Sequence, residues 1–208
     1  KILVTTKDGS KSAYIEENVI VQARDYTPME PVKDASLLCW FDATGRTNQD
    51  IGKETWTDKS GKGVVATLHN FNYNTNGWEN NALKCNGQAY VEIDLEALAD
   101  NAPYGMTVDI RYNTRDVGNQ DACVLEMRGN DTYSKGFAID TEYMYMNSAS
   151  SQLKSTVEQD SISKATFVID RDNKIAKIYN NGVLTETFLM QDSENFTNNT
   201  KIFLGTKL

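Results

Sequence analysis

Between Trp40 and Leu95 the chain reads Trp40-Phe41-Asp42, Trp56-Thr57-Asp58-Lys59-Ser60-Gly61, Ala66-Thr67-Leu68, Asn76-Gly77-Trp78, Cys85-Asn86-Gly87 and Tyr90-Val91-Glu92-Ile93-Asp94-Leu95. Short apolar or alternating segments are separated here by Asp-Lys-Ser-Gly, Asn-Gly and Cys-Asn-Gly, which are sequences typical of turns. Alternation with a period of two places one side-chain face against a core and the other toward water. The stretch therefore predicts an antiparallel β-sandwich.

The same rhythm continues to the end of the chain. Strands are predicted at 36–41, 66–71, 89–95, 106–112, 123–128, 136–140, 142–146, 165–170, 175–180, 185–189 and 201–204. Helical periodicity is confined to residues 95–101, which we expect to form one turn over a sheet edge. Many short strands with almost no helix predict an all-β fold, a two-sheet antiparallel jelly-roll sandwich.

The domain organisation follows from length and proline position. We expect residues 1–34 to form a short N-terminal β segment, a strand, a turn at Asp8-Gly9 and a second strand, ending in a linker that contains Pro28 and Pro31. The jelly-roll domain then covers residues 35–208. A chain of 208 residues with 39% hydrophobic content can bury one sandwich core and has little left for a second.

Charge and cysteine content exclude several classes of partner. The chain has 21 basic and 29 acidic residues, a net charge of -8, and no basic cluster, so we expect it to bind no nucleic acid and no anionic membrane. No apolar run approaches the roughly 20 residues that span a bilayer. Its three cysteines cannot all pair with one another, and they predict free thiols and folding in a reducing cytoplasm.

Two late segments carry a resemblance to a known family. Residues 166–184 read Thr-Phe-Val-Ile-Asp-Arg-Asp-Asn-Lys-Ile-Ala-Lys-Ile-Tyr-Asn-Asn-Gly-Val-Leu, and residues 201–205 read Lys-Ile-Phe-Leu-Gly. Together with the opening stretch, they resemble laminin-G-like domains, which are jelly rolls of the concanavalin A type, over residues 36–208. That resemblance implies glycan binding or a structural role. It also implies that the final strand is missing, so we expect residues after Leu208, the N-terminal segment or a neighbouring chain to cover the open edge, and a homo-oligomer is one solution.

An acidic motif suggests an alternative function. The order Glu92-Ile93-Asp94-Leu95-Glu96 is similar to the Glu-x-Asp-x-Glu signature of laminarinase-like retaining glycoside hydrolases, in which Glu92 would act as nucleophile and Glu96 as acid/base. Four residues of strand span about 13 Å, whereas retaining carboxyl groups lie about 5 Å apart. In addition, Glu96 leads into residues that no longer alternate. We therefore expect no catalytic residues and keep the hydrolase as the minority alternative.

Aromatic residues near turns are the binding candidates. Trp78 follows the Asn76-Gly77 turn, and Tyr143 and Tyr145 share one face of a predicted strand. An exposed aromatic ring offers a flat apolar face to a sugar, so Trp78, Tyr143 and Tyr145 are the predicted carbohydrate-binding residues. Packing in the sandwich is the alternative. It is strongly favoured for Trp40 and Trp56, favoured for Trp78, and evenly balanced for the two tyrosines.

Metal and cofactor chemistry has little support. The single histidine, His69, is expected to be a surface or half-buried strand residue, and it has no ligand partners in its neighbourhood. We expect no cofactor. A calcium ion at the rim of the fold remains open, with turn formation the favoured role of its candidate ligands: Asp116, Asp121 and Asp131, or Asp170 with Asp172.

The sequence thus predicts a non-enzymatic module for glycan recognition or assembly. Its free thiols, acidic charge and many Asn and Thr residues resemble laminin-G-like domains of phage virion proteins in the tail, the baseplate or the capsid surface. The expected partners are bacterial surface glycans or neighbouring virion subunits, and the expected location is the virion after folding in the host cytoplasm. The alternative is a secreted bacterial carbohydrate-binding or adhesin module.

Overall fold

The protein is described by a computed structural model that covers residues 2–5, 12–15, 35–95, 105–114, 123–128, 136–147, 152–170, 172–189 and 201–206. The chain divides into two compact units, Lys1–Val32 and Lys33–Leu208. In the first unit, β1 (Ile2–Thr5) and β2 (Ser12–Ile15) form an antiparallel hairpin in which Ile2 lies opposite Ile15. The predicted linker at Pro28 and Pro31 lies outside the described residues.

The second unit contains a large sheet of eight strands in the order β12-β11-β10-β9-β16-β7-β4-β3, with every pair antiparallel. Its strands are β3 (Thr55–Thr57), β4 (Val65–His69), β7 (Tyr90–Asp94), β9 (Cys123–Arg128), β10 (Gly136–Asp140), β11 (Tyr143–Asn147), β12 (Gln152–Thr156) and β16 (Lys201–Leu204). The last strand, β16, joins β7 to β9 and so unites the early and middle parts of the chain.

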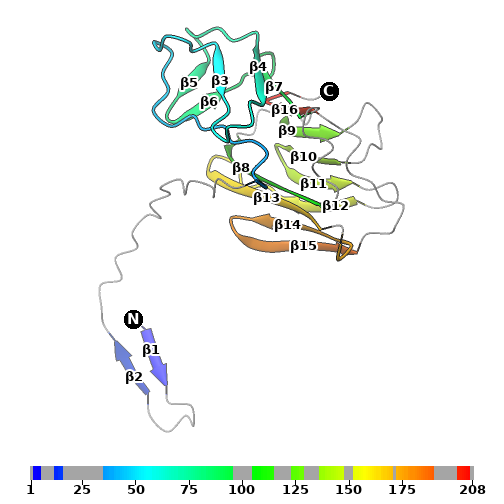
Figure 1. Ribbon diagram of the computed structural model, residues 1–208. Helices are drawn as coiled ribbons and strands as arrows, with labels where there is room; N and C mark the ends of the chain where they lie inside the picture. Colours follow the sequence, from blue (N-terminus) through cyan, green and yellow to red (C-terminus); the bar gives the residue numbers. More distant parts are fainter. Residues whose placement is uncertain are drawn as a thin grey trace. The chain divides into compact units, whose positions relative to one another are not determined.

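A second sheet has four antiparallel strands in the order β15-β14-β13-β8. They are β8 (Gly105–Asn113), β13 (Ile162–Asp170), β14 (Ile175–Asn180) and β15 (Val183–Leu189). Figure 1 shows β13, β14 and β15, in yellow to orange, as a layer facing β9 to β12. A small hairpin of β5 (Gly77–Glu79) and β6 (Ala82–Lys84) lies near β3.

The core lies between the two sheets. Alternation buries one face of each strand, and the rings of Phe137 on β10 and Phe167 on β13 stack across the interface with centroids 5.1 Å apart. Other buried residues of this cluster include Val91, Ile93, Leu125, Ile139, Met144, Met146, Ala165, Ile169, Ala176, Ile178 and Ile202. The fold is therefore all-β, a two-sheet antiparallel jelly-roll sandwich, as the sequence predicts.

The structure corrects the element list in four places. The predicted strand at 36–41 joins no ladder, because the backbone of Trp40 bonds to the Asp58 loop instead: its N–H donates to Asp58 Oδ1 at 2.9 Å and its carbonyl accepts from Lys59 N at 2.8 Å. β3 and the β5–β6 hairpin were not predicted, because three-residue strands give almost no periodic signal. The polar β12 was also missed. Residues 96–101, where one helical turn was predicted, lie outside the described residues.

Turn geometry explains two of the connections. Asn80 and Asn81 between β5 and β6 have φ of 53° and 60°, and Asn181 and Gly182 between β14 and β15 have φ of 50° and 80°. Two consecutive residues with positive φ form the tight hairpin turn that matches strand twist, and Asn and Gly adopt that conformation most readily.

Candidate functional site

The outer face of the eight-stranded sheet carries one continuous cross-strand row. Direct register partners, from β12 to β3, are Lys154, Tyr145, Ala138, Glu126, Phe203, Glu92, Thr67 and Thr55. Side chains alternate along a strand, and the neighbours of these residues in the chain, such as Met144 and Val91, are buried in the core. Residues more than 100 positions apart in the sequence, such as Glu92 and Phe203, therefore share one surface.

The accessible parts of this row are its two ends. Ala138, Glu126 and Phe203 in the middle are 1%, 4% and 8% exposed, whereas Tyr145 and Glu92 on either side are half-buried. Strands lie about 4.8 Å apart, so the four spacings from β11 to β7 separate the two ends by about 19 Å. We call the end near β11 the tyrosine cluster (Tyr143, Tyr145, Lys154, Asp140) and the end near β7 the histidine cluster (His69, Tyr90, Glu92 and Lys201, beside the buried Phe203).

The tyrosine cluster consists of two rings beside one ammonium group. The rings of Tyr143 and Tyr145 lie 5.8 Å apart at 54°, on one face of β11 as the alternation predicts. From the neighbouring β12, Lys154 Nζ lies 3.2 Å from the Tyr143 ring centroid and 5.8 Å from that of Tyr145. A cation over an aromatic face is an attractive contact. The cluster therefore presents half-buried rings together with an exposed hydrogen-bond donor.

Asp140 holds this cluster in place. Its Oδ1 accepts hydrogen bonds from the backbone N–H groups of Glu142 at 2.7 Å and Tyr143 at 2.6 Å, which closes the turn between β10 and β11. Burial raises the pKa of Tyr145 far above the usual tyrosine value, and a hydrogen bond to Asp140 raises it further. The Tyr145 hydroxyl therefore stays protonated beside the Asp140 carboxylate.

The histidine cluster combines stacked rings with an ion pair. His69 on β4 stacks on Tyr90 with ring centroids 4.4 Å apart at 15°, and Tyr90 lies 6.3 Å from Phe203. Glu92 forms an ion pair with Lys201, and its Oε2 lies 3.5 Å from His69 Nε2. The Nε2 atom is buried and the contact with Glu92 does not meet hydrogen-bond geometry. His69 is thus a half-buried strand residue, as predicted.

The sequence did not indicate this second cluster. Its members come from three strands, β4, β7 and β16, and only the register of β16 between β7 and β9 brings Phe203 and Lys201 beside Glu92. The same register places Glu126 opposite Phe203. The alternation of Tyr90 with Glu92 indicated that these two side chains share an outward face. It gave no information about which strands lie beside them.

Glu92 makes one ion pair and one further close contact within the sheet. Its carboxylate contacts Lys201 from β16 and His69 from β4, and its side chain is 23% exposed. Glu96, the second carboxylate of the hydrolase alternative, lies outside the described residues. Through these contacts Glu92 links its own strand, β7, to β4 and β16.

Trp78 proves to be a packing residue, which corrects its place among the predicted carbohydrate-binding residues. It is 3% exposed, Arg46 lies over its ring with Cζ 4.2 Å from the centroid, and Trp56 meets it edge-on at 5.3 Å. Its indole N–H donates to the carbonyl of Lys53 at 2.7 Å. With its ring covered, Trp78 offers no free face to a sugar.

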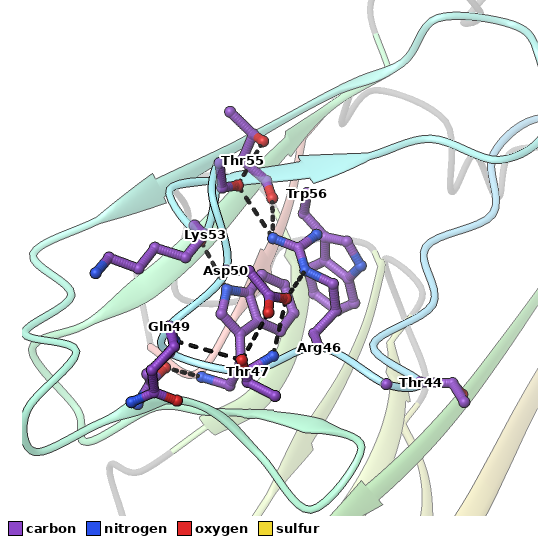
Figure 2. Close-up of polar contacts among 12 residues, drawn as sticks. Thr44, Arg46, Thr47, Gln49, Asp50, Lys53, Thr55 and Trp56 are labelled. Carbon is purple, nitrogen blue, oxygen red and sulfur yellow. Dashed lines mark hydrogen bonds and ion pairs between the residues drawn. The ribbon is translucent and has the colours of Figure 1, made fainter.

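Arg46 belongs to a loop whose polar contacts are drawn in Figure 2. Arg46 donates to the carbonyls of Gly52 at 3.1 Å and Thr55 at 3.0 Å, and its Nε lies 3.4 Å from Asp50 Oδ2. Asp50 in turn accepts from the hydroxyl of Thr47 at 2.6 Å. Trp56 is half-buried, and its indole N–H donates to the backbone carbonyl of Asp42 at 3.1 Å. These polar contacts are internal to the loop, and they indicate a structural role.

Neither a metal site nor a disulfide is found in the described part of the chain. No group of three or more His, Cys, Asp or Glu side chains within it is arranged to hold a metal ion. Asp170 accepts two hydrogen bonds from Asn173 in a turn, and Asp116, Asp121 and Asp131 lie outside the described residues. No helix long and apolar enough to cross a membrane occurs in the described part.

The three cysteines are free, as predicted. Burial, reinforced by the nearby Asp58 carboxylate, raises the pKa of Cys39 to about 11, and burial raises the pKa of Cys85 to about 11. Cys123 is buried. Because the thiolate is the reactive form, these side chains behave as small apolar groups.

Comparison with known proteins gives the class of fold. No protein-family profile and no curated protein sequence matches the chain. Solved botulinum neurotoxin binding domains do match in structure. The serotype C1 binding domain has a TM-score of 0.58 at 15% identity over 86% of this chain and 44% of that chain.

Two further matches are complexes. The binding domain of neurotoxin DC in complex with rat synaptotagmin II has a TM-score of 0.52 at 14% identity, over 84% of this chain and 45% of that one. The same domain in complex with SialylT has a TM-score of 0.52 at 12% identity, over 82% and 44%. This chain spans less than half of each of them. At these identities the likeness shows a shared β-sandwich fold alone.

Proposed function

We propose that the chain is a non-enzymatic glycan-recognition module whose ligand binds the tyrosine cluster. The observation that carries the proposal is the pairing of Tyr143 and Tyr145 beside Lys154 on an otherwise ordinary strand surface. Two half-buried rings supply apolar surface for sugar faces, with Lys154 over one face of Tyr143. The ammonium of Lys154 and the protonated hydroxyl of Tyr145 supply hydrogen bonds for sugar hydroxyls.

The fold supports recognition as the function class. The neurotoxin domains that share the sandwich are binding domains, and two of their structures are complexes with synaptotagmin II and with SialylT. Because the net charge is -8, an anionic polymer meets long-range repulsion, so we propose a neutral glycan. Stacking and neutral hydrogen bonds depend little on ionic strength, and binding should therefore persist at high salt.

The test is a glycan array that contains neutral and anionic bacterial glycans, read with the full chain and five variants. Tyr143→Ala, Tyr145→Ala and the double variant should weaken binding at least tenfold, equivalent to about 1.4 kcal/mol. Lys154→Met keeps the apolar stem and removes the charge. It should weaken a neutral ligand modestly and an anionic ligand strongly. Tyr179→Ala, which removes a half-buried tyrosine from β14 of the other sheet, is the matched control.

Melting temperatures separate binding from folding. Unchanged melting temperatures with lost binding support the site. If the double tyrosine variant unfolds, the rings belong to the core and the proposal is wrong. If it binds as tightly as the wild type, the ligand lies elsewhere or the module is purely architectural.

We propose further that the module belongs to a phage virion protein of the tail, baseplate or capsid surface, folds in the host cytoplasm and contacts the host surface or neighbouring subunits. The three free thiols, the acidic charge and the laminin-G-like sequence features support this placement. A secreted bacterial adhesin or carbohydrate-binding module is the alternative. Genes for virion assembly beside the coding gene would support the first proposal, and a signal peptide on the full-length protein would support the second.

A further inference from the structure

The four-stranded sheet ends at β8, and this edge is long and regular. β8 pairs with β13 along all nine residues, from Gly105 opposite Asp170 to Asn113 opposite Ile162. Within the described ranges, no strand pairs with its other side. The edge contains no proline and no bulge that would block a further strand, so it can accept one.

The inward face of β8 is incompletely covered. Met106, Val108 and Ile110 point toward the core but stay half-exposed. On the adjacent strand β13, the residues on the same face, Ala165, Phe167 and Ile169, are 0%, 1% and 3% exposed. One more strand beside β8 would bury the three half-exposed side chains as β8 itself buries those of β13.

The outward face of β8 carries opposite charges two residues apart. Asp109 and Arg111 are both exposed, and Asp109 also forms an ion pair with Lys164 at 2.8 Å and accepts from the Thr166 hydroxyl at 2.8 Å. If two copies of β8 pair antiparallel around Ile110, Asp109 of each copy lies opposite Arg111 of the partner subunit. Opposite charges in direct cross-strand pairs are stabilising.

The apolar positions agree with the same register. Ile110 lies opposite Ile110 of the partner subunit, and Val108 lies opposite Tyr112 of the partner subunit, all on the core side. A shift of two residues in either direction places Asp109 opposite Asp109 or Arg111 opposite Arg111, which is repulsive. A shift of one residue places the core-facing side chains of one copy opposite the solvent-facing side chains of the other. The pattern on β8 therefore specifies one register.

We propose that β8 is a dimerisation edge at which two copies of this chain join their four-stranded sheets into one continuous sheet across a two-fold axis. Such a dimer carries two glycan-binding faces, and their linkage raises the avidity for a repetitive surface. The opposite edge, β15, has exposed Val183, Leu184 and Leu189 but nothing that specifies a partner.

Sedimentation velocity on the full chain, with charge-reversal variants of Asp109 and Arg111, tests the proposal. The wild type should sediment as a dimer. Asp109→Arg and Arg111→Asp should each sediment as a monomer, because each places like charges opposite one another. An equimolar mixture of the two single variants should form a heterodimer, and the double variant D109R/R111D should again form a homodimer. Glu186→Arg on β15, an equal charge change at the other edge, should stay dimeric.

Cross-linking gives a second readout that does not depend on the charge variants folding. Ile110→Cys places two thiols opposite each other at the two-fold axis, so mild oxidation should yield a covalent dimer on a non-reducing gel. Val183→Cys on β15 should not. A wild type that remains monomeric at all concentrations overturns the proposal. A dimer that survives both single charge reversals, or cross-links through position 183 and not 110, also overturns it.

Discussion

The Asp58 carboxylate accepts four hydrogen bonds within the segment from Trp40 to Leu95. Oδ1 accepts from the N–H groups of Trp40 at 2.9 Å and Ser60 at 2.8 Å, and Oδ2 accepts from Val64 N at 3.1 Å and the Ser60 hydroxyl at 2.7 Å. One side chain thus joins the segment before β3 to the turn after it. We predict that Asp58→Ala strongly destabilises the sandwich without changing its fold.

The magnitude follows from the four bonds. In a part-buried site each hydrogen bond contributes about 1 kcal/mol net, so removal of the acceptor costs about 3–4 kcal/mol. For a chain of this size 1 kcal/mol shifts the melting temperature by roughly 2–4 °C, which predicts a fall of about 6–16 °C. Asp58→Asn keeps one acceptor oxygen and should lose about half as much.

Thermal unfolding followed by circular dichroism is the assay. Ser60→Ala is the matched control in the same turn. It removes the hydroxyl but leaves the three backbone donors bonded to Asp58, so it should cost only about 1 kcal/mol. An Asp58→Ala variant that melts within 2 °C of the wild type would refute the view that this carboxylate organises the loop.

Three further predictions concern chemistry. All three thiols should react with a thiol reagent in denaturant. In the native state Cys39 and Cys85 should react slowly, because burial raises the pKa of each thiol to about 11. Fewer than three reactive thiols in denaturant would indicate an oxidised, secreted protein. The chain should release no reducing sugar from β-glucans, agarose-type galactans or bacterial wall glycans, and turnover that disappears in Glu92→Gln would reverse the non-enzymatic proposal. Burial alone would raise the pKa of Asp42, but hydrogen bonds from Lys59 and Thr44 outweigh burial and lower this pKa to about 2. The ionised Asp42 should therefore stabilise the fold fully above the usual carboxyl pKa of 3.8, and this stabilisation should disappear as the pH falls from 3.8 to about 2. Asp42→Asn should flatten that part of a plot of melting temperature against pH, and a plot identical to that of the wild type would contradict this prediction.

Much of the fold could be predicted because alternation is a local signal. The strands at β9, β10, β14 and β16 have the predicted limits, since each alternates clearly and ends at a turn residue. Pairing order is not local. Nothing in Lys201–Leu204 indicates that this strand lies between β7 and β9, and that position is determined by packing of Ile202 against the core.

The candidate site shows the same division. Alternation on β11 placed Tyr143 and Tyr145 on one face, but Lys154 joins them only through the register of β12. Trp78 follows a turn and therefore suggested exposure. It is buried because Arg46 and the residues around Lys53, some 30 positions earlier, close over it. A turn signal gives the position of the backbone and says nothing about what a distant loop covers.

We propose that a glycan binds the outer face of the eight-stranded sheet at the tyrosine cluster. The most direct test is a titration of the isotope-labelled chain with a glycan selected on the array, followed by amide chemical-shift mapping. For a site at this cluster, the largest shifts should fall on β10, β11 and β12, around Tyr143, Tyr145 and Lys154. Shifts confined to the loop around Trp78 or to the four-stranded sheet, or no shift with any glycan, would contradict it.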